Sequence, residues 1–230
     1  MLFDELNWMG IEDYLRRDDR IVVIIGACEQ HGYSAVTADI LEPLEIARAA
    51  AAVDPVLIAP PMPYGLSPYF ITYPGTISLR VETFAAVVRE VLDVLARQGF
   101  RRVLVSNGHG GNSGVLSSLL VELANAHPDA RFELFQWWTH PAVIEAGEAL
   151  GLKQSHANWS ESFPFTRVVP APAGEKIPPI ISRTASAAEV REKLGDGSYG
   201  GPYRASDEAM AKFFQAAVGA MVAALADLKR

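Results

Sequence analysis

The sequence predicts an α/β protein, a three-layer α/β/α sandwich around a mostly parallel sheet. Four short and continuously apolar runs alternate with segments of helical periodicity. Continuous apolar runs are typical of parallel strands that are buried on both faces. The chain has 230 residues, and half of them are hydrophobic. This size and composition suit one domain with a sizeable core, so we expect residues 1–230 to form a single domain.

The boundaries of the elements follow from the apolar positions and from the residues that end regular structure. The expected strands are Ile21–Ile25, Val56–Ala59, Val103–Val105 and Phe132–Trp138. The expected helices are Ile11–Arg17, Asp39–Ala52, Val81–Gln98, Val115–Ala126, Pro141–Leu150 and Ala209–Lys229. Gly99 is expected to end the third helix, and Ser206 is expected to begin the last one. Residues 153–179 are rich in proline and have no clean period, so no element is predicted there.

Composition and charge argue against several classes of protein. The formal net charge of −7 argues against a general nucleic-acid binder. The single cysteine, Cys28, rules out an internal disulfide framework and is compatible with a reducing compartment. The chain starts without the basic segment of a signal peptide, and its most apolar tail segment, Ala216–Leu225, is too short to cross a bilayer. We therefore expect a cytoplasmic protein that binds neither nucleic acid nor membrane.

A carboxylate and an imidazole follow the first predicted strand. Glu29 and His31 are two residues apart, so in an extended segment their side chains leave on the same face. Asp39 follows shortly after. Glutamate, histidine and aspartate are ligands for divalent metals, and parallel sheets bind ligands at the carboxyl ends of their strands. Taken alone, the stretch is equally compatible with a polar loop of ordinary surface side chains.

Two more polar clusters strengthen the functional interpretation. His109 lies in the glycine-rich segment 106–112, directly after the third predicted strand. Its glycines, which include Gly110 and Gly111, let the backbone approach a bound group, and the helix start that follows favours negative charge. His156 and Glu161 lie in the polar stretch 155–162. A histidine with glycine or acidic neighbours in a loop cluster is a better site candidate than a lone one.

Other segments give weaker or negative signals. The glycine-rich segment has neither P-loop nor GxGxxG spacing, and no GxSxG elbow of a serine hydrolase is present. His127 precedes Pro128 and is interpreted as a helix C-cap. His140 either lines a pocket beside Trp138 or caps the next helix. The long aromatic loop 60–76 is either a pocket wall or a segment docked on a neighbouring subunit.

Four motifs carry a resemblance to a known family: Glu29–Gly32 followed by Asp39, Tyr73–Leu79, Ser106–Asn112, and His156–Ala157 with Glu161. With these motifs in this order, the sequence resembles the creatininase (creatinine amidohydrolase) superfamily over most of its first 165 residues. The resemblance implies one creatininase-like domain with an α/β/α sandwich and a hydrolytic reaction. It also implies a homo-oligomer, which in this family is often a hexamer.

The same resemblance implies a centre of two divalent ions, which are zinc, manganese or iron. The implied ligands are Glu29, His31, Asp39, His109 and Glu161. Asp39 would be shared by both ions. His156 falls at the place of a histidine that contacts the substrate or handles a proton, and Glu161 is also expected to act in catalysis. The expected substrate contacts are Tyr69, Ser78, Gly110, Gly111 and Trp159, although the aromatic ones are equally open to core or interface packing.

Three departures separate this chain from creatininase itself. Gly111 stands where creatininase has a carboxylate, which makes Glu161 the better candidate for the remaining ligand. The segment Tyr33–Ala38 lacks the usual His-Leu-Pro and is one residue short. Tyr69–Phe70 stands where many members have Glu-His before the Pro-Gly-Thr motif. We therefore expect a substrate pocket that differs from that of creatininase.

These observations predict a divalent-metal-dependent hydrolase of the amidohydrolase type. The expected substrate is a small cyclic amide or a formamide, whose C–N bond is cleaved by a metal-activated water. A first alternative is a hydrolase that opens a carbocyclic ketone ring at a C–C bond in polyol metabolism. A second alternative, from another class, is a non-catalytic binding or assembly protein that keeps the fold.

Overall fold

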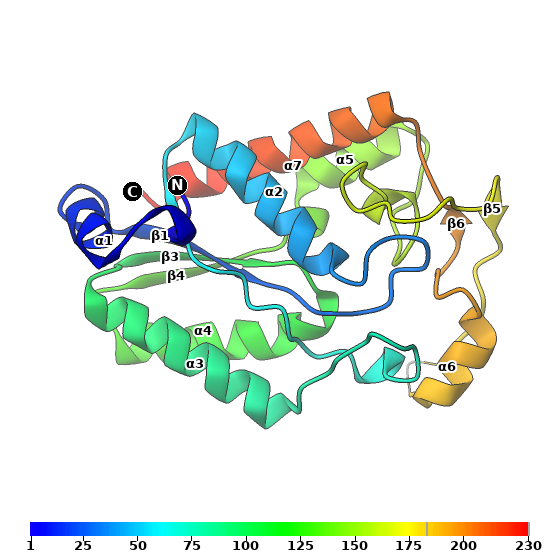
Figure 1. Cartoon of the computed structure of the whole chain (residues 1–230), viewed down its shortest axis with the longest axis horizontal. Helices are drawn as coiled ribbons and strands as arrows, with labels where there is room; N and C mark the ends of the chain where they lie inside the picture. Colours follow the sequence, from blue (N-terminus) through cyan, green and yellow to red (C-terminus); the bar gives the residue numbers. More distant parts are fainter. Residues whose placement is uncertain (183, 230) are drawn as a thin grey trace.

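The computed structural model describes residues 1–182 and 184–229, which form a three-layer α/β/α sandwich (Figure 1). The strands of its central sheet are β1 (Arg20–Ile25), β2 (Leu57–Ile58), β3 (Arg102–Asn107) and β4 (Arg131–Phe135). Their order is β2-β1-β3-β4, and each neighbouring pair is parallel. The predicted fold class is therefore confirmed.

Helices cover both faces of this sheet (Figure 1). One layer consists of α2 (Ala38–Val53), α5 (Pro141–Ala149) and α7 (Asp207–Asp227). The other consists of α3 (Val81–Gln98) and α4 (Ser113–Ala126). The remaining elements lie at the two ends of the sandwich: α1 (Trp8–Leu15) near the chain termini, and α6 (Ala187–Leu194) with the antiparallel pair β5 (Glu175–Lys176) and β6 (Gly201–Pro202) at the opposite end.

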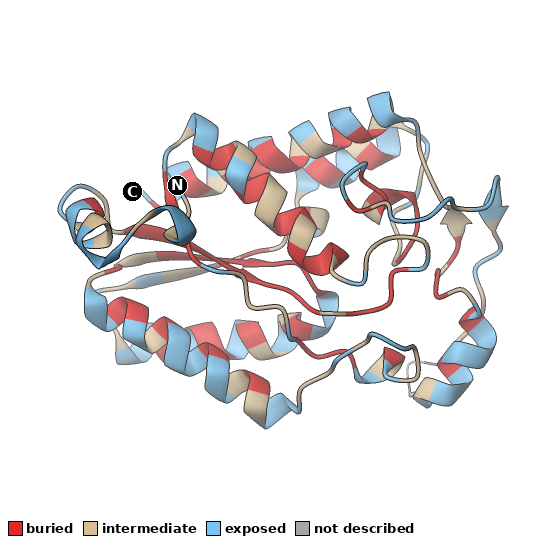
Figure 2. Cartoon of the chain, in the orientation of Figure 1, coloured by how far each residue is buried: buried red, intermediate tan, exposed pale blue. Residues whose placement is uncertain are grey.

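The alternation of side chains along β1 connects the sheet to both helical layers. Val22 and Ile24 belong to the apolar cluster shared with α2, α5 and α7. Ile21, Val23 and Ile25 belong to the cluster shared with α3 and α4. Figure 2 shows this arrangement as buried residues along the strands and on the inner faces of the helices. A strand buried on both faces explains why β1 is a continuous apolar run in the sequence.

Several predicted boundaries are confirmed, and others are wrong. Gly99 ends α3 in the left-handed region, with a φ of 110°, and the Ser206 hydroxyl caps α7 by accepting from the Ala209 N–H. The fourth strand does not extend to Trp138, because a 3-10 turn starts at Trp137. The Trp137 side chain is fully buried and packs edge-on against Phe213. Burial of this ring in the α7 layer explains why the chain leaves the sheet early.

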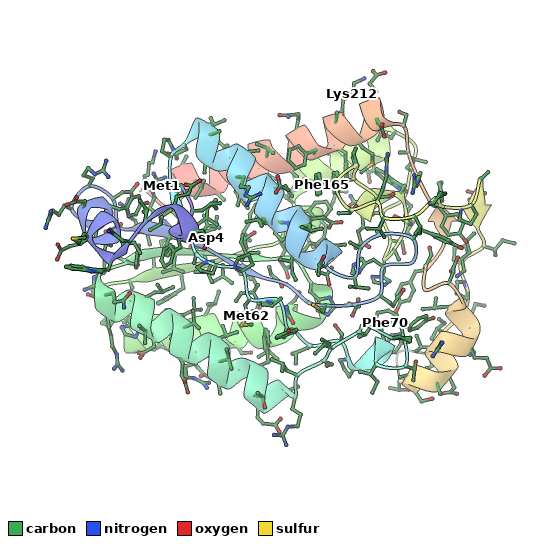
Figure 3. The ribbon with its side chains drawn as sticks, in the orientation of Figure 1. Met1, Asp4, Met62, Phe70, Phe165 and Lys212 are labelled. Carbon is green, nitrogen blue, oxygen red and sulfur yellow. The ribbon has the colours of Figure 1, made fainter. Side chains whose placement is uncertain are left out.

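Helix α6 was not expected from the sequence, although its start carries a recognisable signal. Ser186 and Glu189 form a capping box in which each side chain bonds the other's backbone N–H. The helix packs on the long loop 60–76 through Phe70, which joins Val190 and Leu194 in a small apolar cluster (Figure 3). The loop is therefore covered in part by its own chain.

Helix α7 is longer than the apolar tail segment Ala216–Leu225, which by itself is too short to cross a membrane. It has 21 residues and is long and apolar enough to span a bilayer by length and composition. Its buried residues, among them Phe213, Ala217 and Met221, pack instead into the core cluster with α2 and α5. The core helix of a globular domain passes the same test of length and composition.

The amino end of the sheet holds a buried ion cluster centred on Arg20. The guanidinium is 3% exposed and donates hydrogen bonds to the carboxylates of Asp18 and Asp54 at 2.7–3.1 Å and to the Pro55 carbonyl oxygen at 3.1 Å. Burial alone would raise the pKa of Asp18, but the hydrogen bonds from Arg20 hold it below its usual value. The same donor lowers the pKa of Asp54.

Candidate metal centre

The site forms at the carboxyl end of the sheet, where two neighbouring strands end level. Ile25 pairs with Asn107, and the Gly108 N–H donates to the Ile25 carbonyl oxygen at 2.8 Å. A side chain at position 108 would place its Cβ 1.8 Å from the carbonyl oxygen of Asp39. Gly108 therefore lets the end of β3 touch the first turn of α2. This close approach carries Asp39 toward the two strand ends.

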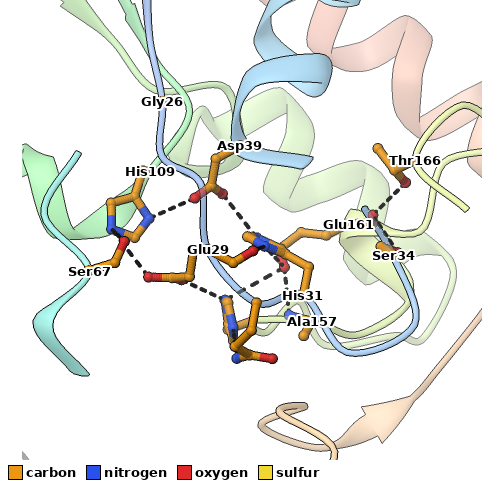
Figure 4. Close-up of polar contacts among 12 residues, drawn as sticks. Gly26, Glu29, His31, Ser34, Asp39, Ser67, His109, Ala157, Glu161 and Thr166 are labelled. Carbon is orange, nitrogen blue, oxygen red and sulfur yellow. Dashed lines mark hydrogen bonds and ion pairs between the residues drawn. The ribbon is translucent and has the colours of Figure 1, made fainter. Parts of the chain in front are cut away.

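Asp39 lies between two imidazoles (Figure 4). Its Oδ1 is 3.0 Å from His31 Nε2, and its Oδ2 is 2.8 Å from His109 Nδ1. Two further carboxylates complete the cluster: Glu29 Oε2 lies 3.6 Å from His109 Nε2, and Glu161 Oε2 lies 3.7 Å from His31 Nε2. The structure thus brings all five predicted ligands together. Asp39 is the carboxylate that lies close to both His31 and His109.

The donor atoms of this cluster fit a divalent metal. Candidate ligand atoms of Glu29, Asp39 and His109 lie within 4.8 Å of one another, and so do those of Glu29, His31 and His156. Three buried atoms, Glu29 Oε2, His31 Nε2 and Asp39 Oδ2, have no hydrogen bond of acceptable geometry, although opposite charges lie nearby. Buried polar atoms are normally hydrogen-bonded, so unsatisfied ones that converge point to a missing ligand. Mixed carboxylate and imidazole donors suit zinc, manganese or iron.

The electrostatics of the cluster agree with a cation site. Burial alone would lower the pKa of His109, but Asp39 and then Glu29 raise it to about 9. Asp39 likewise raises the pKa of His31 well above its usual value, against the effect of burial. The pKa of Asp39 is lowered by both imidazoles, although burial opposes this. Burial raises the pKa of Glu29 to about 7. The carboxylates thus attract positive charge, which protons or a metal ion can supply.

His156 lies beside the cluster, with its ring 4.8 Å from the ring of His31. Its ring stacks on Phe70, with centroids 4.8 Å apart and planes 16° apart, and meets the edge of Tyr199 at 5.3 Å. Its Nδ1 lies 3.6 Å from Glu29 Oε1 and 3.9 Å from Glu161 Oε2. Burial, followed by repulsion from His31, lowers the pKa of His156 well below its usual value.

Glu161 is held by its own loop. Its Oε2 accepts a hydrogen bond from the Ala157 N–H at 2.5 Å, and Ala157 has a positive φ of 54°. A left-handed alanine is strained, and such strain is found most often at functional sites. Burial raises the pKa of Glu161. The carboxyl group is therefore placed to bind a cation or to carry a proton.

A cavity of about 490 Å³ opens beside these residues. Its polar wall includes Glu29, Asp39, His109, His156 and Glu161, together with the backbone of Gly110 and Gly111. Its apolar wall includes Phe70, Trp137, Trp138 and Tyr199. An apolar wall with a few converging polar groups is typical of a site for a small molecule.

Three predicted substrate contacts lie elsewhere, and their positions do not support direct contact with a molecule in this cavity. Trp159 is fully buried in the core, where it packs on Phe213 at 4.9 Å. Tyr69 donates its hydroxyl to the Ser182 carbonyl oxygen. Ser78 accepts from the Ser67 N–H, one residue removed from the site. By contrast, the predicted positions of Gly110 and Gly111 at the cavity are consistent with a substrate contact.

Two histidines outside the cluster have other partners. His127 is the C-cap residue of α4, and its Nε2 lies 2.8 Å from Asp93 Oδ1. His140 is the N-cap of α5, where its ring accepts from the Ala142 N–H. The second histidine thus takes the capping role, one of the two that the sequence left open.

The sequence did not reveal the role of two buried polar residues beside the cluster. Glu42 lies one turn after Asp39 on α2, is 1% exposed, and has no partner for Oε1. Its pKa is raised well above the usual value by burial and then by Glu161. The spacing of three residues from Asp39 was the available signal, since it places both side chains on one helix face. The second residue is Gln30, which contacts His156.

The fold and the cluster define a three-layer α/β/α protein with a buried carboxylate–imidazole cluster whose donor atoms could hold a metal ion. The chain belongs to the creatininase family: the family model described as creatinine amidohydrolase matches residues 4–225. The first sequence relative is the creatinine amidohydrolase of Pseudomonas putida, 32% identical over 116 residues, which are 47% of this chain and 45% of that protein. A second is the 3-dehydro-scyllo-inosose hydrolase of Thermotoga maritima, 31% identical over 110 residues, 47% of this chain and 35% of the relative. The chain thus matches less than half the length of these curated relatives.

Solved structures of the family are similar over nearly the whole chain. A crystal structure of creatinine amidohydrolase (creatininase) superposes with a TM-score of 0.79 at 25% identity and covers 98% of this chain and 96% of its own. A manganese creatininase gives a TM-score of 0.78 at 25% identity, with coverage of 98% and 97%. A mutant creatininase of the Zn–Zn type gives 0.79 at the same identity and coverage.

Proposed function

We propose that the protein is a divalent-metal-dependent hydrolase that cleaves the C–N bond of a small cyclic amide or a formamide. The observation that carries this proposal is the placement of Asp39 between His31 and His109, with unsatisfied ligand atoms converging beside the cavity. Membership of a family described as creatinine amidohydrolase supports the reaction class. The manganese and zinc forms of the related creatininases support the kind of metal.

Two sets of residues would hold two ions. Glu29, Asp39 and His109 form one set, and His31, Asp39 and Glu161 form the other. Such ions, when bound, lower the pKa of a water from roughly 15.7 toward 7 and polarise a carbonyl group.

The chain's own residues position the substrate and move its proton. The backbone of Gly110 and Gly111 lines the cavity just before α4, where a helix N-terminus favours the negative charge that develops on a carbonyl oxygen. Phe70 and Trp138 exclude water along the apolar wall. Glu161, whose pKa is raised by burial, accepts a proton and returns it to the leaving nitrogen. His156 contacts the substrate or shares this proton transfer.

A second candidate function is the opening of a carbocyclic ketone ring. The inosose hydrolase relative favours it, because its name describes a cyclic polyol ketone as substrate and its identity to this chain is 31%. The departures at Gly111 and Tyr33–Ala38 favour a substrate other than creatinine. A binding or assembly protein would not need five converging ligands, so the third alternative has the least support.

Metal analysis combined with substrate assays tests the proposal. We expect protein purified without chelators to hold stoichiometric zinc, manganese or iron, measured by inductively coupled plasma mass spectrometry. Cyclic amides, formamides and cyclic polyol ketones are then offered in parallel, and products are identified by NMR. Asp39→Ala should lose both metal and turnover while remaining soluble. Asp93→Ala, which removes the Asp93–His127 pair, should retain both.

The outcomes separate the alternatives. Ring opening of a cyclic amide to an amino acid, or release of formate and an amine from a formamide, supports C–N cleavage, whereas ring opening of a cyclic ketone to a carboxylate supports the second function. A protein that holds no stoichiometric metal, and in which no metal restores any hydrolysis, contradicts the enzyme proposal. The homo-oligomer and the cytoplasmic location remain predictions, of which the first is tested by light scattering after gel filtration.

A further inference from the structure

Gln30 lies between the two ligand residues Glu29 and His31, but its side chain binds a different part of the chain. It is 6% exposed and makes three hydrogen bonds. Its Oε1 accepts from the Gly32 N–H at 3.1 Å, and its Nε2 donates to the Gly197 carbonyl oxygen at 3.1 Å. The third contact joins Gln30 Nε2 to His156 Nε2 at 2.7 Å.

The two backbone contacts fix the orientation of the Gln30 amide. A backbone N–H can only donate, and a backbone carbonyl oxygen can only accept. The oxygen of the amide must therefore face Gly32, and the nitrogen must face Gly197. Because the same nitrogen faces His156, the hydrogen bond between the two side chains runs from the amide N–H to the imidazole.

This direction determines the proton position on His156. An imidazole nitrogen that accepts a hydrogen bond carries a lone pair, so Nε2 is unprotonated and the ring proton of the neutral form is on Nδ1. A doubly protonated ring would place an N–H against the amide N–H. The Nδ1–H is directed toward the side of the ring where Glu29 Oε1 and Glu161 Oε2 lie at 3.6 and 3.9 Å.

We infer that Gln30 is a positioning residue that holds His156 as the neutral Nδ1–H tautomer, with this N–H presented to the cavity as a hydrogen-bond donor. Phe70 fixes the ring plane by stacking on its face. For the reaction, this inference rests on the proposed function. His156 then keeps its proton and donates a hydrogen bond to the substrate, and the proton transfer is left to Glu161.

Gly197 is part of the same arrangement. It has a φ of +94°, a region that favours glycine, and a Cβ at this position would lie 1.7 Å from Gln30 Oε1. A side chain there would displace the amide. This gives a specific role to one glycine of the glycine-rich stretch before α7.

The test is a long-range ¹H–¹⁵N correlation NMR experiment on full-length protein labelled with ¹⁵N-histidine, which distinguishes protonated from unprotonated ring nitrogens. The His156 resonances are assigned by their loss in His156→Ala. In wild-type protein, both metal-free and loaded with diamagnetic zinc, we expect a protonated Nδ1 and an unprotonated Nε2.

Three variants sharpen the test. Gln30→Glu replaces the donor by an acceptor of the same size, so we expect Nε2 to become protonated, with the tautomer ratio changing by about tenfold or more. Gln30→Met keeps the volume without a hydrogen bond and should give a mixture of tautomers. Gln154→Leu is the matched control, because the Gln154 amide donates to the Val143 carbonyl oxygen instead, and it should leave His156 unchanged. Far-ultraviolet circular dichroism confirms that each variant is folded.

A protonated Nε2 in the wild-type protein overturns the inference, and so does an unchanged tautomer in Gln30→Glu. The experiment needs no substrate. A failure of the proposed hydrolysis therefore leaves the NMR result valid, and a failure of the tautomer prediction leaves the hydrolysis proposal standing with a different role for His156.

Discussion

Buried charges gather at both ends of the parallel sheet, and the two clusters differ in how fully their polar atoms are paired. At the amino end, every nitrogen of the Arg20 guanidinium group donates to Asp18, Asp54 or a backbone carbonyl. At the carboxyl end, Glu29 and Asp39 keep buried oxygens without a hydrogen bond. In the paired cluster each buried charge is compensated, and removing one partner is costly, whereas unpaired buried oxygens mark a place where stability is given up for binding.

The difference predicts that Arg20→Ala will lower stability and leave metal binding intact. Removal of one partner from a buried ion cluster costs about 3–5 kcal/mol, because Asp18 and Asp54 remain as uncompensated charges. Urea unfolding measures this loss, and metal content per folded molecule should equal that of wild type. Arg48→Ala, which removes an exposed pair with Glu45, is the control and should cost less than about 1 kcal/mol. An equal loss in both variants would contradict a structural role for the Arg20 cluster.

Asp39→Ala should abolish metal binding and leave the stability of the metal-free fold intact. A metal at about 100 times its dissociation constant raises the unfolding free energy of the wild type by about 2.7 kcal/mol. We expect this increase to vanish in Asp39→Ala, because both halves of the centre share this carboxylate. Thermal unfolding with and without added Zn²⁺ or Mn²⁺ measures the difference. In Asp93→Ala the increase should persist, and its persistence in Asp39→Ala would remove Asp39 from the ligand set.

Two neighbouring glycines test whether the site depends on backbone contact between β3 and α2. In Gly108→Ala the new Cβ meets the Asp39 carbonyl oxygen, so α2 must shift, at a cost of about 1–3 kcal/mol and with weakened metal affinity. In Gly110→Ala the new Cβ meets no atom within 4 Å, so stability should change far less. Urea unfolding and metal titration of the pair make the comparison. Equal effects would show that the contact at Gly108 does not position Asp39.

The paired cluster should also respond to acid in a defined direction. The folded-state pKa of Asp54 lies below its ordinary value of 3.8, so its contribution to stability is present above pH 3.8 and is lost as the pH falls through the folded-state value. The difference in unfolding free energy between wild type and Asp54→Asn should therefore be about 1 kcal/mol at pH 7 and should shrink below pH 4. Urea unfolding over this pH range measures it. A difference that grows in acid would reverse the assigned sign.

The site residues that could be predicted from the sequence directly follow predicted strands. Glu29 and His31 follow a continuous apolar run, Ile21–Ile25, and His109 follows another, so strand ends alone bring them together. Their roles as ligands followed from the family resemblance. The sequence does not show which group each polar side-chain atom contacts. The contact of Gln30 with Gly197 joins residues far apart in the chain, and no periodicity reports such a pair.

The surroundings of Trp159 could not be predicted either. It was expected at the substrate, although core packing was equally open from the sequence. Trp159 instead fills the core beside Phe213, since a large ring in a short turn over α7 gains more from complete burial. The sequence pattern was the same for both outcomes, so only the packing of α7 decides between them.

The hydrogen bond from Gln30 to Gly197 joins residues 167 positions apart. During synthesis of the chain, the site can therefore be completed only at a late stage. A ribosome releases β1 and the loop after it long before residue 197 is made. The growing chain therefore contains Gln30 without the Gly197 carbonyl group that accepts its hydrogen bond. His156 therefore has no fixed proton position until the glycine-rich stretch has docked. A chain truncated before Gly197 keeps every proposed metal ligand and still lacks the finished site.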